Sequence, residues 1–198
     1  MFETRIHGRG GQGVVTSAEL LSVAAFREGH HAQAFPSFGS ERTGAPVVSF
    51  CRIDDREIRT REPISEPDAV IIVDPTLLHH VDLFGGLKPG GYVLINSSRS
   101  LEELHLDDLA ERLDPERLCT VAATETAREQ LGKPLPNAAM LGAFAMLTGV
   151  VTLESVAAAI RQRFAGEVGE ANVRAAQAAA GLVPRSSGKA AQGVPTNA

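Results

Sequence analysis

Apolar residues recur along the chain with two different periods, and their order predicts strands that alternate with helices. Residues 2–7 have the length of a short strand. A helix is expected next, from Gly11 or Gln12 to Glu28, because apolar residues are spaced there as on one helical face: Val14, Ala18, Leu21 and Ala25. We expect Gly29 to end this helix, since glycine tolerates the backbone conformation common at helix C-termini.

Continuous apolar runs predict strands that a parallel sheet buries on both faces. Residues 69–74 (AVIIVD) and 92–96 are such runs, and residues 119–124 (CTVAAT) are expected to form a further strand. Between these runs, residues 75–84 predict a short helix and residues 101–112 a charged helical segment. Strands that alternate with helices indicate a layered α/β architecture with a mostly parallel sheet.

The segment between the first helix and the AVIIVD run departs from this alternation. Residues 31–35 predict a short strand, and residues 36–44 form a polar loop rich in turn-forming residues. Residues 46–53 contain a β-branched run, and an Asp-Asp turn signal separates them from residues 57–59. We therefore expect an inserted β-hairpin with these two segments as its arms.

The last third of the chain has a different composition. Residues 138–182 are rich in Ala, Leu and Met and predict two or three C-terminal helices. Residues 183–198 hold almost no large apolar side chain, so we expect a disordered or partner-contacting tail. The remainder, residues 1–182, is expected to form one domain.

Composition and charge narrow the possible functions. A chain of 198 residues with 43% hydrophobic residues can bury one good core. The formal net charge is −5 and no run of Lys or Arg is present, which argues against a nucleic-acid partner. No apolar segment is long enough to cross a membrane, and the N-terminus has no secretory pattern. We therefore expect a cytoplasmic protein that contacts no membrane.

The cysteines and histidines do not have the spacing of metal ligands. The only two cysteines, Cys51 and Cys119, are far apart, whereas an iron–sulfur cluster needs about four thiolates. This chain cannot hold a cluster alone, so we expect two reduced structural cysteines in strands. His79 and His80 are expected at a helix end on different faces, where they would not share a metal. We expect no metal site and, without a G-x-S-x-G elbow or spaced Cys/His pair, no catalytic residue.

A glycine-rich turn, in the sequence HGRGGQGVVTSAELL, connects the first strand to the first helix. Gly8, Gly10 and Gly13 satisfy G-x-G-x-x-G in the strand-turn-helix context that this motif requires. Missing side chains let a phosphate approach backbone N–H groups at the positive end of the helix dipole. No Gly-Lys-Ser/Thr follows, which excludes a Walker-type loop. The alternative is that the glycines only allow tight packing of the helix on the sheet.

The dinucleotide-binding form of this motif also needs an acid at the end of the second strand to bind a ribose. Here that region reads HHAQAFPSFGS, and the nearest acid downstream, Glu41, lies past the strand in a loop. The missing acid argues against NAD or FAD. Together with the missing catalytic residues, it argues against an independent NAD-linked dehydrogenase.

A second motif, AQAFPSFGSERTGAPV, gathers polar side chains between two glycines: Ser40, Glu41, Arg42 and Thr43. Such a loop is expected at the carboxyl edge of a parallel sheet. The planar fork of Arg42 suits a phosphate, and Glu41 could hold Arg42 in place or cap a helix. Taken alone, the loop is explained equally well as a solvated turn.

Together, the two motifs resemble the gamma subunit of the 2-oxoacid:ferredoxin oxidoreductases, the pyruvate and ketoisovalerate oxidoreductase family. GRGGQGVVTSAELL, AQAFPSFGSERTGAPV, FCRID, REPI and AVIIVD follow one another in the order of the family. The resemblance covers residues 2–180. It implies a Rossmann-like three-layer α/β domain with a mostly parallel sheet, an inserted β-hairpin and C-terminal helices.

The resemblance also implies cofactors and partners. In this family, alpha and beta subunits bind thiamine diphosphate with Mg²⁺, and a delta ferredoxin-like subunit carries [4Fe–4S] clusters. The complex decarboxylates a 2-oxoacid, transfers the acyl group to coenzyme A (CoA) and passes electrons to ferredoxin or another acceptor. The gamma subunit is expected to help bind CoA and to have no activity alone. A free-standing nucleotide-binding or sensor domain is the alternative function.

The family's motifs imply a set of site residues in this chain. The glycine turn would contact the phosphates of CoA through its backbone: Gly8, Gly10, Gly11, Gln12 and Gly13. Arg42, with Ser40 and Thr43, would lie in the cleft that faces the thiamine-binding subunits, and Glu41 would orient Arg42.

Overall fold

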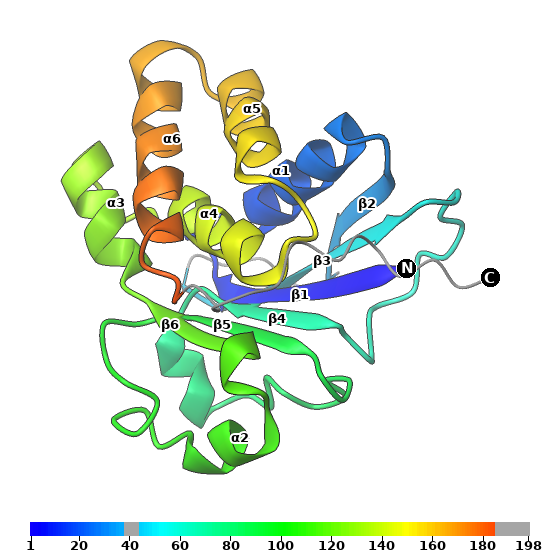
Figure 1. The fold of residues 1–198 in the computed structure, drawn as a ribbon, viewed down its shortest axis with the longest axis vertical. Helices are drawn as coiled ribbons and strands as arrows, with labels where there is room; N and C mark the ends of the chain where they lie inside the picture. Colours follow the sequence, from blue (N-terminus) through cyan, green and yellow to red (C-terminus); the bar gives the residue numbers. More distant parts are fainter. Residues whose placement is uncertain (38–43, 185–198) are drawn as a thin grey trace.

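The computed structural model describes residues 1–37 and 44–184, and within them a sheet lies between two layers of helices (Figure 1). The strands are arranged in the order β2-β3-β1-β4-β5-β6. Their bounds are Phe2–Arg9 (β1), His31–Pro36 (β2), Pro46–Asp54 (β3), Ala69–Ile72 (β4), Tyr92–Asn96 (β5) and Leu118–Val121 (β6). This layered arrangement confirms the predicted α/β fold.

The sheet is mostly parallel, as expected. Strands β1, β4, β5 and β6 run in the same direction, with Ile6 opposite Ile71 in the β1–β4 pair. Strand β3 is antiparallel to both of its neighbours, β1 and β2. The continuous apolar runs of β4 and β5 are buried on both faces because helices cover both sides of these strands.

The expected second arm of the inserted hairpin is wrong, because residues 57–59 form no strand. The hairpin partner of β3 is instead β2, which precedes it in the chain. Phe50 of β3 lies opposite Arg5 of β1 on one side and Phe35 of β2 on the other. Both edges of β3 are therefore occupied, which leaves no free edge for a further strand.

Figure 1 shows α1, α4, α5 and α6 on one face of the sheet, with α3 beside α6, and α2 on the opposite face. The bounds are Val14–Arg27 (α1), Asp107–Arg112 (α2), Ala123–Leu131 (α3), Asn137–Thr148 (α4), Leu153–Arg163 (α5) and Gly166–Ala180 (α6). Two short 3-10 helices, η1 (Pro75–His79) and η2 (Pro115–Arg117), complete the described part of the chain. The three last helices confirm the expected helical C-terminal region.

Several predicted bounds differ from the structure. The first helix begins only at Val14, because Gly13 precedes it in the left-handed conformation with φ 76°. The expected strand 119–124 is too long: β6 ends at Val121 and the unpredicted helix α3 follows at once. Only the last part of 101–112 is α-helical, and only the first part of 75–84 forms η1.

Helix α4 is the central helix of the larger core. Its residues from Asn137 to Ala145 are buried, because α4 packs between the sheet and α6. Gly142 permits this close approach, since a Cβ atom there would overlap the backbone carbonyl of Ala176 in α6. A smaller core on the opposite face packs η1 and α2 against β4 and β5. Val183, just past the expected domain end, is also buried in the larger core.

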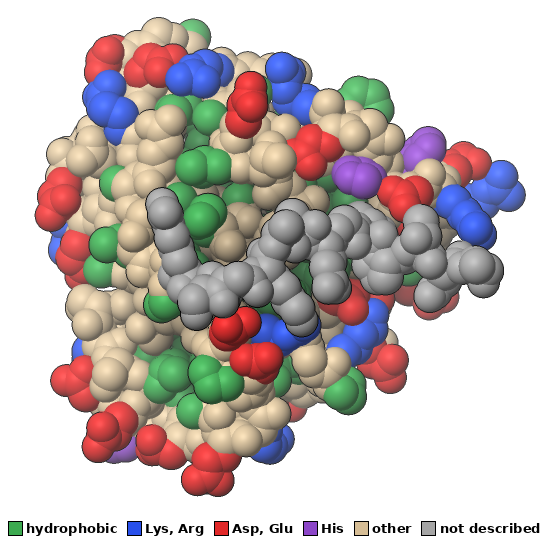
Figure 2. Space-filling model, in the orientation of Figure 1, with side chains coloured by type: hydrophobic (Ala, Val, Ile, Leu, Met, Phe, Trp, Pro, Cys, Tyr) green, Lys and Arg blue, Asp and Glu red, His purple; other side chains and the backbone are tan. Residues whose placement is uncertain are grey.

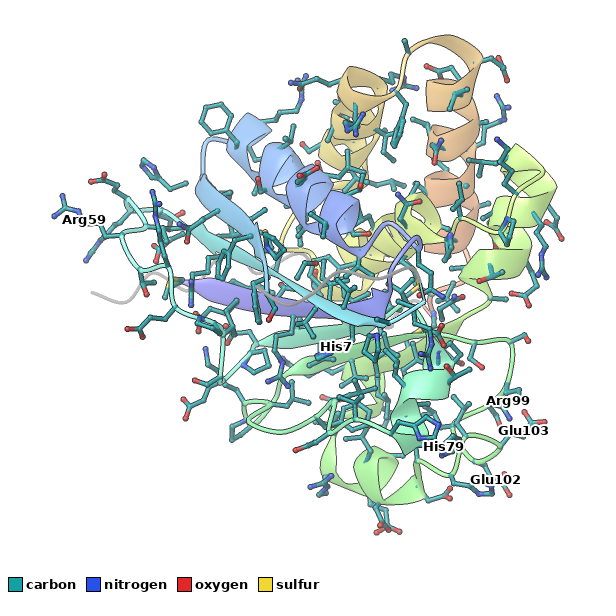
Figure 3. All side chains as sticks on the ribbon, turned by 180° about the vertical axis from the view of Figure 1, so that it is seen from behind. His7, Arg59, His79, Arg99, Glu102 and Glu103 are labelled. Carbon is teal, nitrogen blue, oxygen red and sulfur yellow. The ribbon has the colours of Figure 1, made fainter. Side chains whose placement is uncertain are left out.

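The cysteines and histidines lie as expected from the sequence. Cys51 in β3 and Cys119 in β6 are free and buried, and burial raises their pKa to about 12 and about 11. His79 is the last residue of η1 and His80 follows it (Figure 3). In the described part of the chain, no three His, Cys, Asp or Glu side chains are grouped to hold a metal ion. Within residues 1–37 and 44–184, no helix is both long and apolar enough to cross a bilayer.

Candidate functional site

The glycine turn lies at the carboxyl edge of the sheet, where β1 ends and α1 begins. Its backbone enters the left-handed region at Gly11 (φ 95°) and again at Gly13 (φ 76°). A side chain at either position would strain the backbone, which is why glycine is needed there. The turn therefore presents backbone at the N-terminus of α1, where the helix dipole favours an anion.

Three glycines of the turn, Gly8, Gly11 and Gly13, serve different purposes. A Cβ at Gly8 would lie 2.5 Å from Cγ2 of Val14, so this glycine allows α1 to pack tightly on β1. A Cβ at Gly13 would lie 2.9 Å from Nδ2 of Asn137, at the start of α4. Around Gly11, by contrast, no atom of residues 1–37 or 44–184 lies within 4 Å of a Cβ position. Tight packing thus explains Gly8, whereas none of the described residues packs against Gly11.

The side chain of Gln12 holds the turn in place. Its Nε2 donates a hydrogen bond to Oδ2 of Asp74 at 2.7 Å, and its Oε1 accepts one from the backbone N–H of Arg9 at 2.7 Å. The backbone N–H of Gln12 donates to the carbonyl of Arg9, and that of Gly10 donates to the carbonyl of Ala45. These two N–H groups are therefore already used within the protein.

The backbone N–H groups of Gly11 and Gly13 differ from those of Gly10 and Gln12. Among the described residues, neither has a hydrogen-bond acceptor. The first N–H groups of a helix also have no partner within the helix, which applies here to the turn beginning at Val14. Unpaired donors are thus concentrated at one point, and an anion would satisfy them.

A second polar group lies at this edge, around Asp74, and neither of the two sequence motifs predicts it. Asp74 follows β4 and caps η1. Oδ1 of Asp74 accepts two hydrogen bonds from Thr76, one from its backbone N–H at 2.9 Å and one from its hydroxyl at 2.6 Å. Nε of Arg9 lies 3.3 Å from its Oδ2. Burial alone would raise the pKa of Asp74, but the hydrogen bonds from Thr76 and Gln12, with the charge of Arg9, outweigh it and lower the pKa. The available signal was the acid that ends the AVIIVD run.

The structure brings together the predicted site residues of the first sequence motif. Gly8, Gly10, Gly11, Gln12 and Gly13 share one turn at the sheet edge. The predicted residues of the second motif lie outside the described residues: Ser40, Glu41, Arg42 and Thr43.

Gly44, where the described part of the second motif resumes, lies beside the glycine turn. Its backbone N–H donates to the carbonyl of Gly10 at 3.1 Å, and its carbonyl accepts from Nη1 of Arg9 at 3.0 Å. The second motif is thus anchored to the first at this end.

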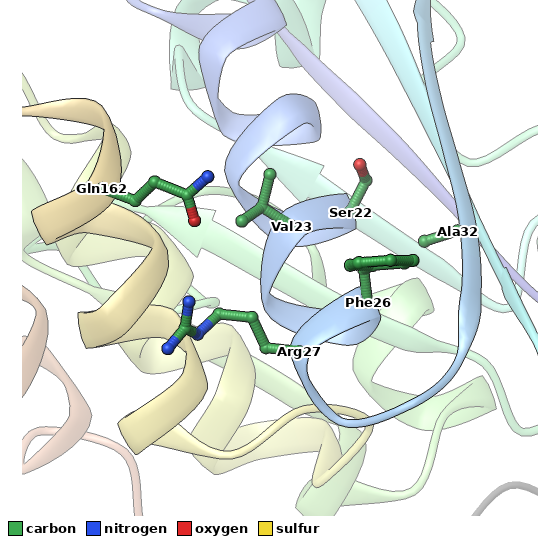
Figure 4. Close-up of a pocket in the computed structure, with 6 residues that line it drawn as sticks. All are labelled: Ser22, Val23, Phe26, Arg27, Ala32 and Gln162. Atoms are coloured by element: carbon green, nitrogen blue, oxygen red, sulfur yellow. The ribbon is translucent and has the colours of Figure 1, made fainter.

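A groove of about 570 Å³ lies elsewhere, between the end of α1, β2 and α5 (Figure 4). Its lining includes Phe26, which is 73% exposed, and Arg27. Because Phe26 and Arg27 are at the opposite end of α1 from the glycine turn, this groove is not part of the site. On the face that Figure 2 shows, acidic and basic side chains are interspersed among apolar ones.

Comparisons with known proteins agree with this arrangement. A family model described as pyruvate ferredoxin/flavodoxin oxidoreductase matches residues 3–182. The common subunit gamma of the pyruvate/ketoisovalerate oxidoreductases from Thermococcus kodakarensis is 52% identical over 179 residues, which are 90% of this chain and 95% of that protein. The match to the family model, over residues 3–182, includes both sequence motifs.

Solved structures share the fold. Pyruvate oxidoreductase subunit PORC from Thermotoga maritima superposes with a TM-score of 0.78 at 35% identity, over 92% of this chain and 97% of that one. A 2-oxoglutarate:ferredoxin oxidoreductase from Magnetococcus marinus, 18% identical, shares the fold with a TM-score of 0.71, over 93% of this chain and 32% of the other. These similarities favour the oxidoreductase subunit over a free-standing sensor domain. The chain belongs to the pyruvate ferredoxin/flavodoxin oxidoreductase family, as the gamma subunit of a multi-subunit 2-oxoacid:ferredoxin oxidoreductase.

Proposed function

We propose that this chain helps to bind CoA in a complex that carries out the CoA-linked oxidative decarboxylation of a 2-oxoacid. In this proposal, alpha and beta subunits hold thiamine diphosphate and Mg²⁺, and a delta ferredoxin-like subunit carries [4Fe–4S] clusters. Electrons leave the complex to ferredoxin or another acceptor. Residues 1–182 form the domain that docks on these partners, and residues 183–198 are a tail available for a further contact.

The observation that supports CoA most strongly is the pair of N–H groups, on Gly11 and Gly13 at the start of α1, that have no acceptor within residues 1–37 and 44–184. CoA carries a pyrophosphate, and phosphate oxygens are suitable acceptors at a helix N-terminus. None of the described residues blocks the approach of such a group to the backbone at Gly11. The structure from Magnetococcus marinus that shares this fold contains CoA and succinyl-CoA.

In this proposal, some residues of the turn bind the ligand and the others hold the turn in its conformation. Gly11 and Gly13 donate their N–H groups to the pyrophosphate, while the side chain of Gln12 keeps the turn in shape. Gly8 and Gly10 support the same backbone through packing and the bond to Ala45.

The second motif supplies the charged part of the proposed site. Arg42 pairs with a phosphate of CoA, with Ser40 and Thr43 beside it in the cleft that faces the thiamine-binding subunits. Glu41 orients Arg42. Bound CoA supplies the thiol that accepts the acyl group; this chain contributes binding and orientation only.

The cysteines of this chain fit the assignment of clusters to a partner. Cys51 and Cys119 are buried in different strands, β3 and β6, which are separated by three others in the sheet. A [4Fe–4S] cluster needs four converging ligands, commonly thiolates. Two separated and protonated thiols cannot provide them, so cluster binding falls to another subunit.

The test is CoA binding and turnover by the assembled complex with Arg42→Ala in this chain. The expected result is a KM for CoA raised ~10-fold or more, with subunit composition unchanged in size-exclusion chromatography, because a charged hydrogen bond to phosphate is lost. Arg59→Ala is the matched control, since Arg59 is exposed and its one ion-pair partner among the described residues is the exposed Glu57.

Unchanged kinetics in Arg42→Ala would exclude Arg42 from the site. A wild-type complex that turns over its 2-oxoacid without binding CoA would overturn the proposed function itself.

A further inference from the structure

The N-terminus of a second helix, α4, meets the glycine turn. Asn137, the first residue of α4, lies directly against Gly13, with its Nδ2, Cγ and Cβ atoms 2.9, 3.1 and 3.2 Å from where a Cβ of Gly13 would be. Pro136 precedes it, and no side chain caps the helix. The first N–H groups of α1 and α4 therefore lie at neighbouring, uncapped helix ends.

Asn137 is a largely buried polar side chain whose amide makes no hydrogen bond within the described part of the chain. It is 7% exposed, and its amide is not one of the polar groups of the described residues that are both fully enclosed and unpartnered. The amide donors are therefore free to reach a ligand at the turn. The other two buried asparagines behave normally. Nδ2 of Asn96 donates to the carbonyl of Val73 at 2.8 Å, and Nδ2 of Asn172 donates to the carbonyl of Val168 at 2.8 Å.

The geometry points to Asn137 as a further ligand-binding residue of the turn. We infer that its Nδ2 donates a hydrogen bond to a phosphate oxygen of the molecule held at Gly11 and Gly13. This inference rests on the proposed function and adds a third, neutral donor from another part of the chain. It also explains the position of Gly13, since any side chain there would displace the amide.

A neutral amide suits this position for an electrostatic reason. The buried carboxylate of Asp74 is already paired with Arg9 at the same edge of the sheet. A further cation could form a competing pair with Asp74, whereas an amide donates without a formal charge. At the glycine turn itself, the attraction for phosphate then comes from oriented N–H groups and helix dipoles, in addition to the charge proposed for Arg42.

The decisive variant is Asn137→Asp in the assembled complex, because Asp has the shape of Asn and lacks the amide donors. Affinities for CoA and for inorganic pyrophosphate are measured by calorimetry, together with the melting temperature. We expect both affinities to fall ~10-fold or more, since a hydrogen bond to a charged group is replaced by repulsion. The melting temperature reports whether the variant still folds, because the helix dipole favours an acid in the first turn while burial of its charge opposes folding.

Two further variants separate the possible causes. Asn137→Ala removes the donors without adding charge and should also weaken binding ~10-fold. Gln162→Glu adds the same charge on α5, near the far end of α1, and should change neither affinity.

Each outcome decides a different statement. A wild-type complex that binds neither probe overturns the proposed function. If the wild type binds CoA and both Asn137 variants bind it equally well, the proposed function stands and this inference is overturned. Loss of affinity in Asn137→Asp alone would show charge repulsion rather than a lost donor, and would also overturn it.

Discussion

The amide of Gln12 and the carboxylate of Asp74 are joined by a 2.7 Å hydrogen bond that ties the glycine turn to the end of β4. The two residues are 62 positions apart in the chain. The bond is made by Gln12, a non-glycine residue of the glycine-rich turn. It fixes the direction in which the turn presents the N–H groups of Gly11 and Gly13, since Gln12 also accepts a hydrogen bond from the backbone of Arg9.

Replacing Gln12 by Glu should destabilise the protein by about 1–3 kcal/mol at neutral pH, because a second carboxylate would face Asp74 without a proton between them. Urea unfolding of the isolated chain measures the change. The loss should shrink in mild acid, where one of the two carboxylates takes up a proton. Gln162→Glu, at an exposed position of α5, serves as the control and should lie within about 0.5 kcal/mol of the wild type. Equal stability of Gln12→Glu and wild type would show that the tether to Asp74 contributes nothing.

Alanine substitutions should separate the glycines of the turn. Gly11→Ala is expected to cost about 1–2 kcal/mol from backbone strain, because no atom of the described residues lies near the added Cβ. Gly13→Ala should cost about 1–3 kcal/mol more, since the Cβ would also press against Asn137. Thermal unfolding monitored by circular dichroism gives both values. The prediction fails if the two variants are equally stable.

Gly29→Ala is a matched control for ligand binding at Gly11. Gly29 has φ 90° and open surroundings, like Gly11, but lies beyond the C-terminal end of α1. Both variants carry similar backbone strain, yet only Gly11→Ala should weaken CoA binding in the complex. If both lower the affinity equally, the effect comes from strain and not from the turn.

Gly142→Ala should destabilise the protein, although Ala normally favours a helix over Gly by about 1 kcal/mol. The added Cβ would overlap the carbonyl of Ala176, so α4 and α6 must move apart at a cost of about 1–3 kcal/mol or more. Chemical denaturation checks the sign of the change. The exposed substitution Ala178→Gly on α6 calibrates helix propensity, with an expected loss of about 1 kcal/mol. A stabilised Gly142→Ala would contradict the close helix contact.

His7 should make stability depend on pH. Burial, reinforced by the charge of Arg5, lowers the pKa of His7 from 6.5 to about 4, and Figure 3 shows it in the middle of the molecule. The unfolded chain therefore binds a proton between these pH values that the folded chain does not. Stability is full above about pH 6.5 and falls by up to ~3 kcal/mol as the pH drops towards 4.

The comparison that isolates His7 is between the wild type and His7→Gln across this pH range. The wild type should lose more stability than the variant between pH 6.5 and 4, while groups common to both cancel. Parallel profiles for the two proteins would show that the ring of His7 is not protonated on unfolding.

The sequence determined the parts of this protein that depend on local spacing. The apolar run of β4 is buried on both faces because its residues are apolar in succession, whichever helices cover them. The strand-turn-helix order around Gly8 to Gly13 follows from glycines placed where apolar periodicity changes. Family membership was also recognisable, since long motifs in order are more specific than the glycine pattern.

Tertiary structure alone decided which groups are left free to act. The N–H of Gly10 donates a hydrogen bond to the carbonyl of Ala45, and the N–H of Gln12 donates one to the carbonyl of Arg9. The N–H groups of Gly11 and Gly13 have no acceptor among the described residues. The partner of β3 is β2 rather than the segment after it, because β3 pairs along both edges. Such pairings join positions tens of residues apart and depend on how the chain closes, whereas sequence spacing acts only within a turn or a strand.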